Sequence, residues 1–61
     1  MIPEGMKDYF VYLERLRRSG VTNMFGAAPY LQEEFGLSRR DARDTLTAWM
    51  NNYDPEDYKE V

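Results

Sequence analysis

The stretch Pro29-Tyr-Leu-Gln-Glu-Glu-Phe-Gly-Leu-Ser-Arg-Arg-Asp-Ala-Arg43 predicts a helix, a tight turn and a second helix. Gly36 can adopt the left-handed backbone conformation that often ends a helix, and Leu37 supplies an apolar residue that folds back over that end. Ser38 is a preferred residue for capping the next helix, and Asp41 follows it three positions later. The remaining elements can be predicted outward from this helix pair.

Apolar residues at helical spacing predict three helices. Because Pro29 fits the first turn of a helix, the second helix is expected over residues 28–35. The third runs from Arg39 to about Asn52, with an apolar stripe of Ala42, Leu46, Trp49, Met50 and Tyr53. The first runs from Pro3 or Gly5 to Arg18 and stops at Gly20, with a stripe of Met6, Phe10, Leu13 and Leu16 or Arg17. The expected fold is a compact, all-α three-helix bundle.

The connection over residues 19–28 combines turn-forming residues with apolar ones. Val21, Met24 and Phe25 predict a loop that tucks under the bundle. Thr22 or Asn23 can cap a single turn. Gly26 indicates a special backbone angle or a close approach.

The charge is unevenly distributed. Residues 54–61 contain four acidic residues and one lysine, whereas residues 1–53 contain seven acidic and seven basic residues. The last eight residues therefore carry the whole net charge of −3. Pro55 and this run of charges disfavour a further helix. We expect one domain over residues 1–53 and a disordered acidic tail over residues 54–61.

The composition argues against an enzyme. The 61 residues include no cysteine and no histidine, so thiolate chemistry and the usual near-neutral base are absent. No glycine-rich phosphate loop or metal-ligand cluster occurs. We expect no cofactor, no metal and no small-molecule substrate. The longest apolar run, Tyr9–Leu13, is too short to cross a membrane, so a cytoplasmic location is expected.

Arginines on the third predicted helix form the main candidate site. Arg39, Arg43 and Thr47 share one outward side, with Arg40 beside them. Arginine reads guanine edges and grips phosphates through its planar, multiply donating group. Arg15 and Arg18 on the first helix could add phosphate contacts. The alternative is a solvated surface on which Arg40 pairs with Asp44 one helical turn away.

Residues 28–47 resemble the helix-turn-helix family, with inward, turn and small residues at Leu31, Phe35, Gly36, Leu37 and Ala42. The resemblance implies that the third helix enters the major groove of DNA. Gln32 and Thr45 depart from the family pattern, which prefers a small and an apolar residue there. The stretch Phe35–Ala42 also resembles ubiquitin-associated-type modules, which bind protein partners.

The segment Ser19-Gly-Val-Thr-Asn-Met-Phe-Gly26 is similar to a motif of small phage and prophage proteins. The similarity continues through Pro29–Leu31 and Trp49–Met50, and it implies a mobile-element origin and a host cytoplasmic location. Two functions remain open, and a structural or assembly role through homo-oligomerisation is not separated from the second of them. The first is a DNA-binding regulator, with the first helix as the candidate surface for a homodimer. The second is a module that binds or inhibits a host protein through the acidic tail or through Val11, Tyr12 and Tyr30.

Overall fold

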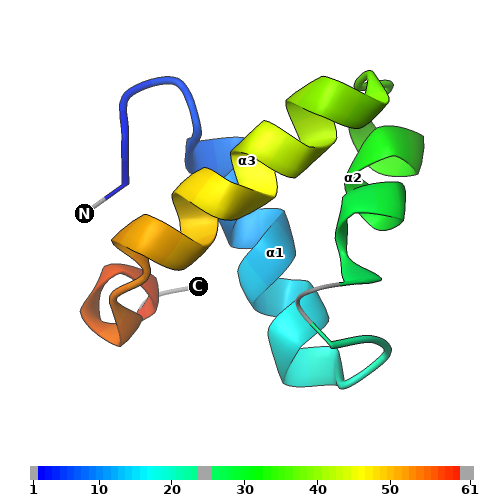
Figure 1. Ribbon diagram of the computed structural model, residues 1–61. Helices are drawn as coiled ribbons and strands as arrows, with labels where there is room; N and C mark the ends of the chain where they lie inside the picture. Colours follow the sequence, from blue (N-terminus) through cyan, green and yellow to red (C-terminus); the bar gives the residue numbers. More distant parts are fainter. Residues whose placement is uncertain (1, 24–25, 60–61) are drawn as a thin grey trace.

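The computed structural model describes residues 2–23 and 26–59. Within them the chain forms α1 (Lys7–Ser19), α2 (Ala28–Phe35), α3 (Arg39–Asn52) and the short 3₁₀ helix η2 (Pro55–Tyr58). Helix α3 lies diagonally across α1, and α2 stands beside the N-terminal half of α3 (Figure 1). The described part of the chain contains no strand. The expected all-α three-helix bundle is therefore confirmed.

The turn between α2 and α3 has the predicted chemistry. Gly36 ends α2 at φ +68°, and its N–H donates to the carbonyl of Gln32 at 2.9 Å. Ser38 caps α3, because its hydroxyl accepts a 3.1 Å hydrogen bond from the backbone N–H of Asp41. Helices α2 and α3 both begin and end where the sequence indicated.

Helix α1 begins later than predicted, at Lys7 rather than at Pro3 or Gly5. Gly5 adopts φ +81°, and the N–H of Met6 donates to the carbonyl of Pro3, so a turn precedes the helix. The other end is as expected. Gly20 adopts φ +70° and its N–H closes the helix on the carbonyl of Leu16 at 3.2 Å.

The core collects one face of each helix and the C-terminal segment. Its buried apolar residues are Phe10, Leu13, Leu16, Ala27, Leu31, Ala42, Leu46, Trp49 and Tyr58. Phe35 is partly buried at the edge, where Tyr9 and Tyr12 meet it edge-to-face with ring centroids 4.8 and 5.5 Å away. Met50 was expected in the core but is 36% exposed, because it lies at the margin of the face that α3 turns inward.

The loop before α2 differs in part from the prediction. Val21 is 56% exposed and does not tuck under the bundle. Met24 and Phe25, which were expected to do so, lie outside the described residues. Asn23 caps the turn, since its Oδ1 accepts from the N–H of Gly26 at 2.9 Å. A Cβ on Gly26 would lie 2.7 Å from Thr22 Oγ1, so Gly26 serves a close approach.

The C-terminal segment corrects the expectation of a disordered tail as far as the structure describes it. Residues Pro55–Tyr58 form η2, and Asp54 caps it by accepting from the N–H of Glu56 at 3.0 Å. Tyr58 is completely buried, while the acidic side chains of η2 stay exposed. Burial of one aromatic ring offsets the cost of ordering a charged segment whose charges remain in water. The folded unit therefore extends past residue 53 to Tyr58.

Candidate nucleic-acid interface

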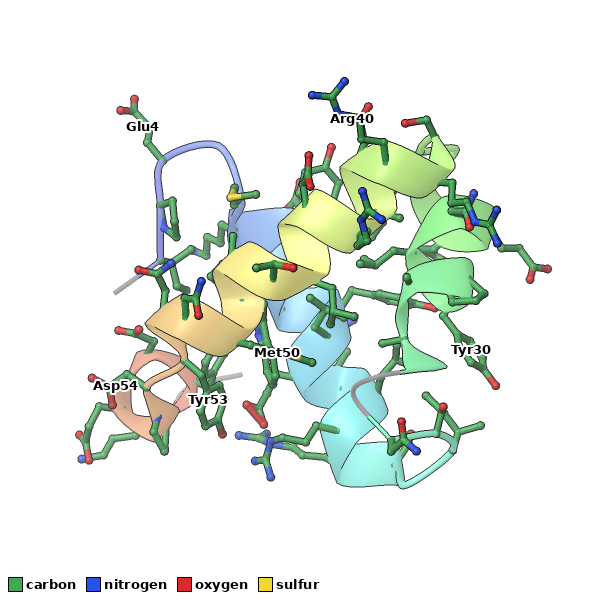
Figure 2. The ribbon with its side chains drawn as sticks, in the orientation of Figure 1. Glu4, Tyr30, Arg40, Met50, Tyr53 and Asp54 are labelled. Atoms are coloured by element: carbon green, nitrogen blue, oxygen red, sulfur yellow. The ribbon has the colours of Figure 1, made fainter. Side chains whose placement is uncertain are left out.

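The side chains of Arg39, Arg40, Arg43 and Thr47 are all exposed on α3, within its first nine residues. We call these four residues the α3 arginine face. Arg40 projects into solvent at the end of α3 next to the turn (Figure 2). The face is locally ordered, because Thr47 Oγ1 donates to the carbonyl of Arg43 at 3.0 Å. The structure thus brings together all four of the residues predicted on this helix.

Acidic residues interrupt the charge of this face. Asp41 and Asp44 are exposed beside the arginines. Arg40 Nε lies 3.9 Å from Asp44 Oδ2, with the two side chains 85% and 66% exposed. Exposed pairs at this separation contribute little, because water screens them and both side chains lose freedom. The pairing therefore leaves Arg40 able to exchange its carboxylate for another anion.

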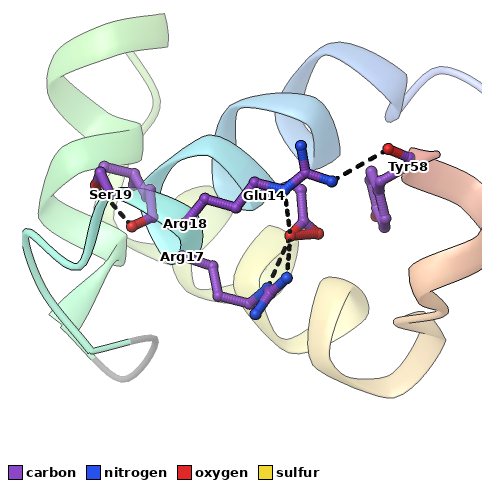
Figure 3. Close-up of polar contacts among 6 residues, drawn as sticks. Glu14, Arg17, Arg18, Ser19 and Tyr58 are labelled. Atoms are coloured by element: carbon purple, nitrogen blue, oxygen red, sulfur yellow. Dashed lines mark hydrogen bonds and ion pairs between the residues drawn. The ribbon is translucent and has the colours of Figure 1, made fainter. Parts of the chain in front are cut away.

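The second arginine cluster is built around a buried carboxylate. Glu14 on α1 is completely buried, and its Oε1 accepts from Arg17 Nε at 2.8 Å and contacts Arg17 Nη2 at 2.6 Å (Figure 3). Arg18 Nε lies 3.5 Å from the same oxygen. The hydrogen bond to Glu14 raises the pKa of the Arg17 guanidinium above its usual value. The burial of Glu14 was missed from sequence, although its position four after Phe10 continues the inward stripe.

Arg18 also holds the C-terminal segment. Its Nη2 donates to the backbone carbonyl of Tyr58 at 3.2 Å. Arg15, the other predicted phosphate contact on α1, is exposed. The 14 residues of α3 span about 20 Å, and Tyr58, which Arg18 contacts, belongs to η2, the element that follows the C-terminal end of α3. The structure therefore does not bring Arg18 together with the α3 arginine face.

Aromatic rings fill the space between α3 and the C-terminal segment. The ring of Tyr53 lies 4.7 Å from that of Trp49 and 5.7 Å from that of Tyr58. The guanidinium of Arg17 lies 5.4 Å from the centre of the Tyr53 ring, which adds a cation–π contact. Three buried polar atoms here make no hydrogen bond with the described residues: Glu14 Oε2, Trp49 Nε1 and Tyr58 Oη.

Two tyrosine phenols of this region have raised pKa values. Burial raises the pKa of Tyr58, and the N–H of Trp49 offsets part of that rise although it stays outside hydrogen-bond geometry. Burial also raises the pKa of Tyr53, and the neighbouring carboxylate of Glu14 raises it further. Both phenols are therefore neutral over the physiological pH range.

The three residues predicted to contact a protein partner lie on α1 and α2. Val11, Tyr12 and Tyr30 are each partly buried. The hydroxyl of Tyr12 donates to the carbonyl of Tyr30 through a long hydrogen bond of 3.5 Å. Burial raises the pKa of Tyr12, and the negative charges of Glu34 and Glu33 contribute to the rise. The structure therefore joins Tyr12 and Tyr30 in one surface with acidic neighbours.

Other kinds of site were sought in the same part of the chain. Residues 2–23 and 26–59 contain no pocket and no group of three acidic, histidine or cysteine side chains that could hold a metal ion. None of the described helices is both long enough and apolar enough to span a bilayer. Comparison with protein-family models, characterised proteins and solved structures finds no match to the chain.

Proposed function

We propose that this protein is a small, non-enzymatic regulatory module of phage type that binds DNA through α3. In this proposal α3 enters the major groove, and the α3 arginine face contacts base edges and phosphates. The proposal rests mainly on one observation. Arg39, Arg40, Arg43 and Thr47 are all exposed within the first nine residues of a helix that a tight, capped turn fixes against α2.

Packing supports this assignment because α2 and α3 meet through a different side of α3. Leu31 of α2 and Ala42 and Leu46 of α3 are buried in the shared core. The arginines therefore remain in solvent, while the opposite face of the same helix packs against the core. The major groove is about 12 Å wide and admits one α-helix. Residues near the start of such a helix are the ones that reach base edges.

Electrostatics predict modest affinity with a strong dependence on salt. Arg39 and Arg43 make no ion pair with the described residues, so their charges are available to phosphates. Asp41 and Asp44 repel the same phosphates. Each arginine–phosphate contact releases counterions, so binding weakens as salt concentration rises. The first two turns of α3 should respond most to DNA.

The test is an NMR titration of isotope-labelled protein with duplex DNA of about two helical turns, at low and near-physiological salt. We expect salt-sensitive shifts over residues 39–47. The double variant Arg39→Ala with Arg43→Ala should lose binding while remaining folded. A matched control, Lys7→Ala with Lys59→Ala, removes the same charge from exposed positions elsewhere and should bind nearly as well. Equal affinity of the arginine variant and the control contradicts the proposal.

A second candidate is a module that binds a host protein through Val11, Tyr12 and Tyr30. The contact between Tyr12 and Tyr30 favours it, because tyrosine is enriched in protein interfaces. This function predicts no response to DNA at low salt and a stable complex from host lysate. Tyr30→Ala should lose that complex, while Arg39→Ala with Arg43→Ala should keep it.

A further inference from the structure

The C-terminal segment contacts the bundle through both the ring and the carbonyl of Tyr58. The ring of Tyr58 is completely buried against the core, and its carbonyl accepts the hydrogen bond from Arg18 Nη2 (Figure 3). The rest of η2 is exposed, including Pro55, Glu56 and Asp57. Tyr58 thus supplies both a buried ring, which also stacks on Tyr53, and a hydrogen-bonded carbonyl to the attachment of this segment.

Docking of this segment changes what Arg18 can bind. The guanidinium of Arg18 faces Glu14 Oε1 at 3.5 Å and the carbonyl of Tyr58 at 3.2 Å. The same segment carries Asp54, Glu56 and Asp57 against a single Lys59, so it brings a net negative charge toward the arginines of α1. The side chain of Arg18 is 47% exposed, so a phosphate can reach part of it, but a phosphate that binds Nη2 must displace the carbonyl and overcome this charge.

The docked state also leaves polar groups unsatisfied. Trp49 Nε1, Tyr58 Oη and Glu14 Oε2 are buried without a hydrogen-bond partner among the described residues. A buried polar group without a partner costs free energy that water would restore. Release of Tyr58 exposes these atoms to water, which offsets part of the lost ring burial. The docked and released states are therefore closer in free energy than a fully apolar contact would make them.

We propose that Pro55–Tyr58 is an autoinhibitory latch on the arginines of α1. While the latch is docked, Arg18 is engaged within the protein. When Tyr58 leaves the core, Arg18 becomes a second phosphate contact. This contact lies toward the C-terminal end of α3, away from the turn between α2 and α3. This inference rests on the proposed DNA-binding function and adds a device that regulates it.

The protein contains its own reporter of latch position. Trp49 is the single tryptophan of the chain, it is 3% exposed, and its indole lies beside Tyr53, whose ring stacks on Tyr58 of the latch. At low salt, saturation with a duplex of about two turns should shift Trp49 emission to longer wavelength. The ring resonances of Tyr58 should move toward solvent-exposed values in the same titration.

Two matched variants test the role of Arg18. Arg18→Met keeps an apolar stem but cannot donate to Tyr58, so the population in which Tyr58 is released should rise without DNA. Loss of one ordinary hydrogen bond raises the released population about five-fold. The variant should also reduce the slope of log affinity against log salt by about one. Arg15→Met removes the same charge from the same helix and should leave Tyr58 and Trp49 as in the unmodified protein.

Three results overturn the inference in different ways. If residues 39–47 respond to DNA while Tyr58 and Trp49 do not, the latch is wrong and the proposed function stands. If residues 39–47 give no response at low salt, DNA binding fails and the latch has no such ligand to regulate. Equal salt slopes for Arg18→Met and the unmodified protein also overturn it.

Discussion

Arg18 and Tyr58 lie 40 positions apart in the chain, and a 3.2 Å hydrogen bond joins the Arg18 guanidinium to the Tyr58 carbonyl. This bond closes the segment after α3 onto the end of α1. Because the ring of Tyr58 is buried at the same place, the segment becomes part of the core. The stability of so small a domain should therefore depend on a residue near its end.

Tyr58→Ala should strongly destabilise the protein, because it removes a completely buried ring. Truncation of large buried aromatic residues to alanine costs about 3–5 kcal/mol, which is a large share of the stability of a small domain. Urea unfolding followed by circular dichroism measures the effect. Tyr58→Phe is the control, and it should be nearly neutral because the Tyr58 hydroxyl makes no hydrogen bond with the described residues. An alanine variant as stable as the phenylalanine variant contradicts this account.

Helix boundaries could be predicted where a local signal marks them. Gly36 and Ser38 have chemistries that specify one kind of helix end each, and both lie where predicted. Gly5 was ambiguous, because a glycine near a proline and a glutamate is compatible with either a first turn or a preceding loop. The structure resolves it as a left-handed residue before α1.

The docked segment could not be predicted, because its composition is typical of a disordered terminus whereas its packing orders it. Its charges and Pro55 are typical of a disordered terminus, whereas its order depends on the tertiary contacts of the single residue Tyr58. Exposure of the α3 arginine face followed from helical periodicity alone. The hydrogen bond between Arg18 and Tyr58 could not be predicted, because a contact between residues so distant in sequence leaves no local pattern.

Glu14→Ala should destabilise the fold, because Glu14 is completely buried and organises two arginines. Hydrogen bonds to charged groups contribute about 1.5–3 kcal/mol, and the half-exposed arginines favour the low end of that range. We expect a loss of about 2 kcal/mol in the free energy of unfolding. Glu14→Gln, which keeps the shape and one acceptor, should lose less. Glu33→Ala on the exposed side of α2 is the surface control, and an equal effect of all three substitutions argues against the proposed role of Glu14.

Gly36→Ala should lower stability through backbone conformation alone. Gly36 has φ +68°, and a Cβ there would meet no atom within 4 Å. The left-handed region costs a residue with a Cβ about 1 kcal/mol, and asparagine tolerates it better than alanine. Thermal unfolding should therefore rank the glycine protein above Gly36→Asn and Gly36→Asn above Gly36→Ala. For a domain of this size, the alanine variant should melt about 4–8 °C lower. An unchanged melting temperature indicates that the turn rearranges.

Gly26→Ala tests the close approach in the loop before α2. An added Cβ would lie 2.7 Å from Thr22 Oγ1, so the alanine methyl must push that hydroxyl aside. We expect a loss of stability that the second substitution Thr22→Ala relieves. A double-mutant cycle measures this coupling, because contacting residues depart from additivity. Strict additivity of the two substitutions contradicts the predicted contact.

Alkaline pH should destabilise the protein through Tyr53, which is partly buried, and Tyr58, which is completely buried. Burial raises the pKa values of Tyr53 and Tyr58 in the folded state above the value of about 10 expected in the unfolded chain. As pH rises through 10, the unfolded state loses phenolic protons that the folded state retains, so unfolding becomes more favourable. The stability due to neutral phenols is therefore fully present below pH 10 and declines between that pH and the folded-state pKa values. Urea midpoints measured from pH 7 to 11 should fall more steeply for the unmodified protein than for Tyr58→Phe, whose residue 58 cannot ionise. Parallel curves for the two proteins show that Tyr58 does not couple folding to pH.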